Sequence, residues 1–160
     1  MPTNLYGPYD NFNLENGHVI PALINKFHDA KRNNFNSVEV WGTGKPRREF
    51  LHVDDLAEAC FFIMNLSKND YMKSTDPSMS HINVGTGQEI SINNLIDELI
   101  SVTNFKGNIV YDETRPDGTL TKVLDVSKIN ALGWRHKIDL ENGLKDTYEW
   151  YEKNYPKVRF

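Results

Sequence analysis

The sequence predicts an α/β domain in which short strands alternate with amphipathic helices. Brief apolar runs typical of strands alternate along the chain with segments whose apolar residues recur every three or four positions. The alternation by itself is also compatible with an α+β arrangement. The 160 residues are 39% hydrophobic, 11% aromatic and 25% charged, a composition that supports one globular domain with its own core.

The N-terminal segment is expected to be a strand end, a polar loop and a helix. Residues 1–6 have strand character, and Gly7-Pro8 stops the strand and opens a loop that lasts to Gly17. Apolar residues at helical spacing then predict a helix over 18–32, with Pro21 tolerated in its first turn.

Two further extended segments and a second helix should follow. Residues 38–41 have the pattern of a strand, residues 42–46 that of a turn, and residues 50–53 that of a short extended segment. A helix over 56–66 is expected next, and a polar loop over 67–80 after it.

The start of that second helix carries two adjacent carboxylates. Asp54 or Asp55 is expected to be its N-cap, since a carboxylate there accepts from free backbone N–H groups and faces the positive end of the helix dipole. Cys60 falls on the apolar face with Leu56 and Ile63, so we expect a buried core residue and no nucleophile.

The second half repeats the alternation. A strand is expected over 81–84, and Ser91 should cap a helix whose apolar side includes Leu95 and Leu99. The remaining elements are a strand over 108–111, a loop over 112–121, a segment over 122–126, a short helix ending near Gly133, and a final helix over 140–154.

Charge and hydropathy narrow the possible partners. Eighteen basic and 22 acidic residues give a net charge of -4, so no overall basic field attracts nucleic acid, and any anion site must be local. The longest apolar stretch, 59–64, is far shorter than the roughly 20 residues that span a bilayer. We therefore expect neither a nucleic-acid nor a membrane partner.

Cysteine and histidine spacing indicates no metal site. Cys60 is the single cysteine, and the five histidines have no metal-ligand spacing with it or with one another. One cysteine excludes an internal disulfide and suits a reducing compartment. The N-terminal residues have neither a basic region nor an apolar one typical of a secretion signal, so we expect a cytoplasmic protein.

Glycine and arginine clusters are candidate phosphate sites. Neither Gly42-Thr43-Gly44 nor Gly85-Thr86-Gly87 continues to the third glycine of a dinucleotide-binding fingerprint, and tight turns are the favoured interpretation. The cluster 45–48 contains Arg47 and Arg48, whose guanidinium groups are suited to a diphosphate. A solvated loop explains the same cluster.

His18 is the candidate for proton transfer. It lies at the predicted start of a helix after an asparagine-rich loop, where side chains are presented to ligands. Histidine donates or accepts protons near neutral pH. A surface or capping role is the alternative.

A family resemblance covers nearly the whole chain. Pro2-Thr3-Asn4-Leu5-Tyr6-Gly7-Pro8, Asp10-Asn11-Phe12 and the segment 17–23 resemble the GDP-L-fucose synthase branch of the extended short-chain dehydrogenases/reductases. Segments shared with that family continue, in family order, at 40–44, 48–57, 80–87, 116–119 and 122–126.

The resemblance implies an oxidoreductase and epimerase of nucleotide-sugar biosynthesis. Such an enzyme epimerises GDP-4-keto-6-deoxy-D-mannose at the two carbons beside its ketone and reduces the ketone with NADPH, so the implied cofactor is NADP(H). The family enzyme is expected to be a homodimer. The implied fold is the smaller substrate-binding lobe of such an enzyme with a remnant of the Rossmann sheet.

The resemblance also assigns roles to residues. His18 matches a proton-transfer residue of the epimerisation. The implied cofactor-binding residues are Pro2, Thr3, Asn4 and Leu5, at the strand end beside the nicotinamide, and His18. The implied substrate-binding residues are Lys26, Trp41, Arg48, Asp117 and Lys122. Asp117 lies in a Pro-Asp-Gly turn, where an Asx-turn is the structural alternative.

Two family features are not found in these 160 residues. The glycine-rich strand-turn-helix is not present, and no lysine stands four positions after any of the seven tyrosines. We therefore expect residues 1–160 to correspond to the C-terminal substrate-binding part, without the Rossmann cofactor domain, and to be inactive alone. The rival hypotheses are a related enzyme for another nucleotide sugar and a GDP-sugar-binding module without catalysis.

Overall fold

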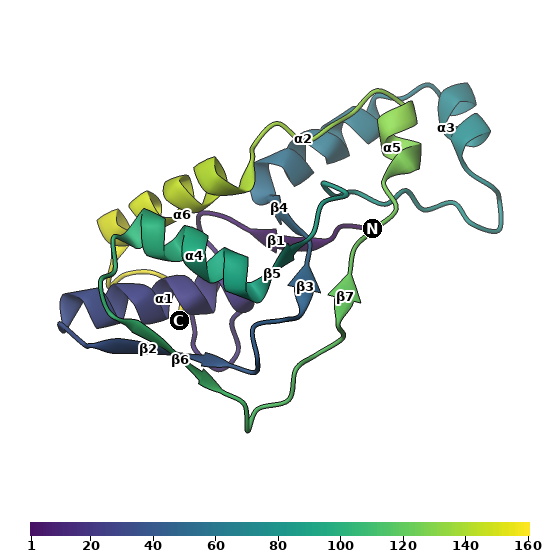
Figure 1. Cartoon of the computed structure of the whole chain (residues 1–160). Coiled ribbons are helices and arrows are strands. Elements are labelled where there is room, and N and C mark those ends of the chain that lie inside the picture. The colour runs from purple at the N-terminus through teal and green to yellow at the C-terminus, as the bar shows by residue number, and fades with distance from the viewer.

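The computed structural model describes residues 1–160 and confirms the α/β class, with six helices around three small sheets (Figure 1). The strands are β1 (Asn4–Tyr6), β2 (Ser37–Trp41), β3 (Arg47–Arg48), β4 (Phe50–His52), β5 (Ile90–Ser91), β6 (Asn108–Asp112) and β7 (Thr121–Lys122). The helices are α1 (Val19–Arg32), α2 (Val53–Met64), α3 (Lys68–Ser74), α4 (Ile92–Thr103), α5 (Ser127–Ala131) and α6 (Leu140–Asn154).

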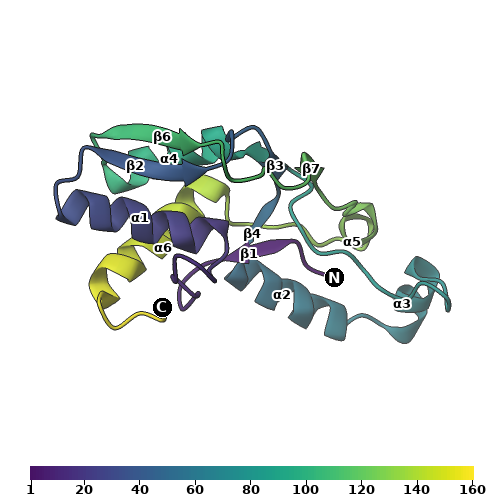
Figure 2. The same cartoon turned by 90° about the horizontal axis from the view of Figure 1, so that it is seen from below.

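The sheets are short and mostly parallel. β1 pairs with β4, and β2 pairs with β6, both in parallel. In the third sheet β3 lies between β5, which is antiparallel to it, and β7, which is parallel. Figure 2 shows the β2–β6 ribbon at one end of the molecule and β1–β4 near the N-terminus. Parallel strands separated by helices are the hallmark of α/β architecture.

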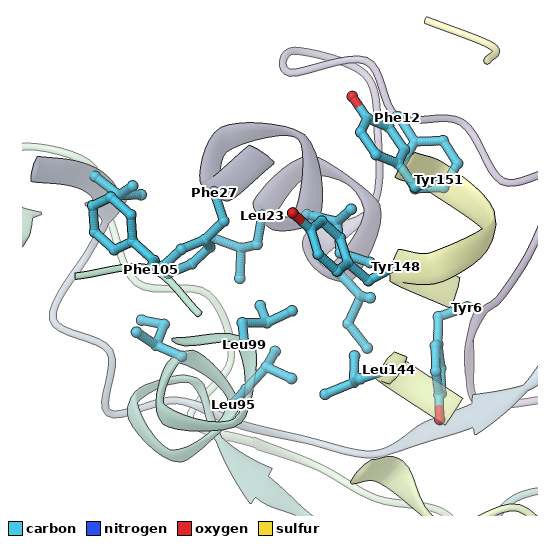
Figure 3. Close-up of a cluster of buried hydrophobic side chains, with 14 of the residues drawn as sticks. Tyr6, Phe12, Leu23, Phe27, Leu95, Leu99, Phe105, Leu144, Tyr148 and Tyr151 are labelled. Atoms are coloured by element: carbon cyan, nitrogen blue, oxygen red, sulfur yellow. The ribbon is translucent and has the colours of Figure 1, made fainter. Parts of the chain in front are cut away.

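The main hydrophobic core joins α1, α4 and α6 to the β2–β6 sheet (Figure 3). Its aromatic members include Phe27, which meets Phe105 edge to face with ring centroids 5.5 Å apart. Leu95 and Leu99 are fully buried here, as the helical spacing predicted. Ser91 caps α4 by accepting a hydrogen bond from the Asn94 N–H, which confirms that prediction.

A smaller core lies where α2 and α5 pack near β4. It consists of Leu51, Ala59, Ile82, Val84, Val126, Ile129 and Trp134. The molecule therefore has two packed regions, one on each side of the β3–β4 connection.

The loop over 7–17 is held by buried contacts with α1, which directly follows it, and with α6 near the C-terminus. The Asn25 Nδ2 donates to the Phe12 carbonyl at 2.8 Å, and the Tyr151 hydroxyl donates to Asn25 Oδ1 at 3.0 Å. The Phe12 ring is fully buried against Tyr151. The Phe12 N–H also donates to the Arg159 carbonyl. These bonds fix the path of the chain into α1.

Glu49 links the segments that meet between the two cores. Its side chain is fully buried, and its two carboxylate oxygens accept from the Gly87 N–H and the Leu124 N–H, each at 2.8 Å. Its backbone carbonyl accepts from the side chains of Thr3 and Asn4. A buried carboxylate is stable only when such donors replace water.

The predicted cap of α2 was wrong. The N-cap is His52, whose Nδ1 accepts from the Asp54 N–H at 3.3 Å. Asp55 is buried and accepts instead from the Lys137 and Ile138 N–H groups, both at 3.0 Å. The Asp55 carboxylate, one of the two expected to cap α2, thus accepts hydrogen bonds from a segment more than 80 residues away.

Three other predictions were also wrong. Cys60 is exposed, because Ala59 faces the core in its place. The segment 67–80 contains helix α3, capped by Ser67. Residues 81–84 form no strand, and instead Val84 makes a single bridge with Pro2.

No helix of the structure is both long and apolar enough to cross a membrane.

We predict that Glu49→Ala lowers the free energy of unfolding by about 2–5 kcal/mol, because it removes a fully buried side chain and deprives the Gly87 and Leu124 N–H groups of their acceptor. Urea denaturation measures the change. Glu113→Ala is the matched control, since that side chain is exposed in a loop and forms no hydrogen bond, and it should be nearly neutral. Equal stability of the two variants would contradict the role of Glu49.

Candidate functional site

His18 lies on the walls of two adjoining cavities. It is the N-cap of α1, and its side chain makes no capping hydrogen bond. One cavity extends from His18 towards β1, and the other extends along α1 towards β2. The imidazole is thus available to a ligand that occupies either space. Because the side chain makes no capping hydrogen bond, the alternative that it caps α1 is wrong.

The first cavity has a volume of about 510 Å³ and runs along the end of β1. Its walls are residues 3–10, His18 and Val53. Thr3, Asn4 and Leu5 therefore share a cavity with His18. Pro2 lies outside it, beside Met1 and Val84. Tyr6 lines the cavity but is only 2% exposed.

Asp10 is a carboxylate of this cavity that the sequence argument did not single out. Burial raises the pKa of its carboxyl group, and the Asn11 N–H and the nearby His18 and Arg159 lower it by smaller amounts. The Asn11 N–H donates to Asp10 Oδ1 at 2.7 Å. An acidic group and an imidazole therefore face the same space.

The second cavity, of about 250 Å³, brings Lys26 and Trp41 together with His18. Most of its other walls are apolar and come from the loop before α1, the first turns of α1, and β2. Lys26 Nζ donates to the Glu39 carbonyl at 2.9 Å and lies 4.9 Å from the centroid of the Trp41 ring. Burial lowers the pKa of the Lys26 amine.

Arg115 is a second cation at Trp41 that the sequence argument missed. Its Cζ lies 4.9 Å from the indole centroid, and its Nε lies 3.8 Å from Asp112 Oδ2. The sequence contained a clue to this position, because Arg115 directly precedes the Pro116-Asp117-Gly118 turn. Trp41, which is 48% exposed, thus stands beside two positive charges.

Asp117 holds the turn that follows Trp41. Its two carboxylate oxygens accept from the Thr43 N–H and the Thr43 hydroxyl at 2.9 and 2.6 Å. Gly42 has a φ of +80°, and a Cβ there would collide with the Asp117 carboxylate. The Gly42-Thr43-Gly44 segment is therefore a tight turn, as predicted, and Asp117 cross-links it to the 112–121 loop.

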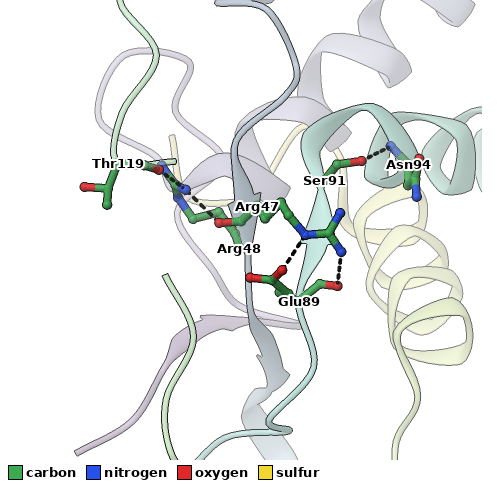
Figure 4. A network of polar contacts seen from close by, with 6 residues as sticks. All are labelled: Arg47, Arg48, Glu89, Ser91, Asn94 and Thr119. Atoms are coloured by element: carbon green, nitrogen blue, oxygen red, sulfur yellow. Dashed lines mark hydrogen bonds and ion pairs between the residues drawn. The ribbon is translucent and has the colours of Figure 1, made fainter. Parts of the chain in front are cut away.

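Arg48 and Lys122 are paired residues on the neighbouring strands β3 and β7. They line neither cavity. The Arg48 Nη1 donates to the carbonyls of Arg47 and Thr119 (Figure 4). Arg47 forms an ion pair with Glu89 at 2.5 Å. The structure thus groups His18, Lys26 and Trp41, and places Arg48, Asp117 and Lys122 just beyond Trp41.

The fold agrees with the comparisons with known proteins. Residues 1–85 match the model of the NAD dependent epimerase/dehydratase family. That is more than half of the chain, which therefore belongs to this family.

The most informative relatives are GDP-L-fucose synthases. The enzyme of that name from Escherichia coli K12 is 50% identical over 99% of this chain and 50% of its own length. GDP-L-fucose synthase 1 of Arabidopsis thaliana is 50% identical over 96% of this chain and 45% of its own length. A GDP-L-fucose synthetase from Naegleria fowleri bound to NADP has a TM-score of 0.86 and 32% identity, over 99% of this chain and 47% of that one. The chain spans about half the length of these relatives.

We predict that Asp10→Asn stabilises the protein at pH 7 and not at pH 3. A raised pKa means that the ionised carboxylate is less favourable in the folded state. The unfolded chain loses this proton first, so stability falls as pH rises from about 3.8 through the folded pKa. Asparagine keeps an acceptor for the Asn11 N–H and carries no charge. Thermal unfolding at both pH values measures the difference, and equal shifts at the two would contradict the prediction.

Proposed function

We propose that this chain is the substrate-binding part of a GDP-L-fucose synthase, which converts GDP-4-keto-6-deoxy-D-mannose to GDP-L-fucose with NADPH. The observation that carries the proposal is the position of His18 between a cavity along β1 and a cavity containing Lys26 and Trp41. The 50% identity to an enzyme of that name supports it.

The chemistry requires a proton-transfer group beside a ketone. The carbonyl acidifies the C–H bonds on its two sides, so a base can remove a proton and an acid can return one to the opposite face. His18 is assigned this proton transfer. Its ring makes no hydrogen bond in the protein, and it faces the cavity that Lys26 and Trp41 share.

The residues of the first cavity fit the nicotinamide end of NADP(H). β1 pairs with β4, and just before β1 the Thr3 N–H donates to the Val84 carbonyl. The side chains of Thr3 and Asn4 donate to the Glu49 carbonyl. The backbone of Asn4 and Leu5, which line this cavity, is assigned to the nicotinamide. When bound, NADPH supplies the hydride. The phosphates need a glycine-rich segment that this sequence does not contain.

The GDP part is assigned to the cations around Trp41. Lys26 and Arg115 lie nearest to the indole, and Arg48 and Lys122 lie beyond the Gly42 turn. A diphosphate between them would be held by charge-assisted hydrogen bonds. Asp117 is assigned the role of fixing that turn, so its contribution to binding is indirect.

We further propose that the catalytic Ser and Tyr-x-x-x-Lys residues and the cofactor's phosphate site belong to a Rossmann half with which this chain works. The complete enzyme is expected to be a cytoplasmic homodimer. A related enzyme for another nucleotide sugar would prefer UDP or dTDP to GDP. A GDP-sugar-binding module would keep GDP affinity and show no turnover when joined to such a half.

We predict that His18→Asn slows proton exchange by about 10²- to 10⁴-fold with little change in GDP affinity, because general acid–base help acts in the transition state. The test uses a chimera in which the cofactor-binding half of the Escherichia coli relative precedes this chain. Solvent deuterium uptake at the two carbons beside the ketone gives the rate, and calorimetry gives the affinity.

Arg48→Ala in the same chimera is the comparison. Loss of a diphosphate contact should weaken GDP binding more than it slows exchange. If His18→Asn exchanged deuterium at the parental rate, the proton-transfer role would be wrong.

We also predict that the 160-residue chain alone does not oxidise NADPH with GDP-4-keto-6-deoxy-D-mannose, because it lacks a tyrosine and lysine at the family spacing to protonate the reduced oxygen. Absorbance at the NADPH band follows the reaction. The chimera is the positive control, and turnover by the chain alone at the chimera's rate would refute the prediction.

A further inference from the structure

We infer that Glu39 recognises the guanine base of the bound nucleotide in a third cavity beyond Lys26. This inference rests on the proposed function and assigns base specificity to the side chain of Glu39, whose backbone carbonyl accepts from Lys26.

The third cavity continues the second one. It has a volume of about 270 Å³ and shares Leu14 and Lys26 with the cavity that contains His18 and Trp41. Its other walls are Asp29, Ala30, Phe35, Ser37, Val38 and Glu39, from the last turns of α1 and the start of β2. Figure 2 shows these two elements side by side. The two cavities together form one groove along α1.

The length of the groove indicates where each part of the ligand would lie along it. His18 and Lys26 are eight residues apart along α1, which corresponds to about 12 Å at 1.5 Å per residue. If the sugar ketone lies at His18, the diphosphate lies near Lys26 and Trp41. The base then reaches the cavity on the far side of Lys26.

The walls of that cavity suit a flat purine. Phe35 and Leu14 are large apolar side chains that are about half exposed, and they offer apolar contact to the faces of a ring. Apolar walls with a few placed polar groups are typical of small-molecule sites. The polar groups of the cavity determine which base is bound.

Glu39 offers an unpaired acceptor at this position. Side chains along β2 alternate between buried and exposed, so Glu39 is exposed on the same face as Trp41. Its carboxylate forms no hydrogen bond or ion pair, and only its backbone carbonyl is engaged, by Lys26. Asp29, the other carboxylate in the cavity, already accepts from Asn33 Nδ2 at 2.7 Å.

Guanine is the base that matches a carboxylate. Its N1–H and its 2-amino group are two adjacent donors, which a carboxylate accepts with both oxygens at once. Adenine has an acceptor at N1 and no 2-amino group, and uracil has a single ring donor between two carbonyl oxygens. Both would leave one carboxylate oxygen unpaired against the ligand, which costs affinity.

The test compares GDP with inosine diphosphate, which differs only by the missing 2-amino group, and with UDP. Calorimetry on the 160-residue chain gives the three affinities for the parent protein, Glu39→Gln and Asp29→Asn. We expect the parent to prefer GDP to inosine diphosphate by about tenfold or more, and Glu39→Gln to reduce that ratio to near one. Asp29→Asn is the matched control and should keep the parental ratio. Both side chains are on the surface groove, and thermal unfolding checks that the variants are folded.

The outcomes separate this inference from the function on which it rests. A GDP preference that Glu39→Gln leaves unchanged, or that only Asp29→Asn removes, overturns the role of Glu39 and leaves the proposed function standing. Equal weakening of all three nucleotides by Glu39→Gln also overturns base recognition. A chain that binds UDP more tightly than GDP, or binds none of the three, overturns both.

Discussion

The buried carboxylate of Glu49 is the interaction on which the arrangement of the chain most depends. It lies between β3 and β4, so it joins the strand that carries Arg48 to the strand that pairs with β1. Its oxygens hold the Gly87 turn and the segment at Leu124, and its carbonyl holds Thr3 and Asn4. Gly85 is required beside it, because a Cβ there would collide with the carboxylate. The side chain and carbonyl of this one residue thus hold three segments that the smaller hydrophobic core also joins. A buried carboxylate keeps this geometry only while every donor is present.

The site inherits its geometry from that arrangement and from the anchored loop before α1. Asn25 holds the loop from within α1, and Tyr151 holds Asn25 from α6. His18 is therefore positioned by the main core, whereas the end of β1 is positioned by Glu49. A ligand that spans both cavities contacts residues from both systems. Precise placement of reacting groups by a rigid surrounding shell is what a proton-transfer site requires.

Local sequence patterns predicted correctly those helices whose capping residues and apolar faces lie close together in the sequence. The helices α1, α4 and α6 begin within a residue of their predicted starts, because Ser91 and the periodic apolar faces act locally. The cap of α2 was mispredicted because its first donor is taken by a histidine ring nitrogen, and because Asp55 is recruited by a distant segment. Local propensity does not contain such tertiary contacts.

The same distinction between local patterns and tertiary contacts applies to the residues of the site. The resemblance implied that Lys26, Arg48 and Lys122 surround the diphosphate, whereas one cavity of the structure is lined by Lys26, Trp41 and His18 and by neither Arg48 nor Lys122. Arg115 lies at Trp41 and Asp10 near His18 because loops fold against them, and Glu39 lines a groove only because α1 and β2 enclose it. Spacing along one sequence does not reveal such proximity. It appears only when burial and distance are known in three dimensions.

The electrostatics of the groove are compatible with the proposed binding of a diphosphate by a chain of net charge -4. Burial is the main cause that lowers the pKa of Lys26; Glu39 opposes the change, and the neighbouring Arg115 adds to it. Two cations held beside one indole therefore repel each other at a place where water is partly excluded. A diphosphate that enters between them replaces that repulsion with two attractions, and it does so over a few ångströms, where distant acidic residues are screened. In the proposed binding mode, a base at Glu39 adds selectivity at the point where the phosphate charge no longer acts. Affinity and specificity would then come from different ends of the same groove.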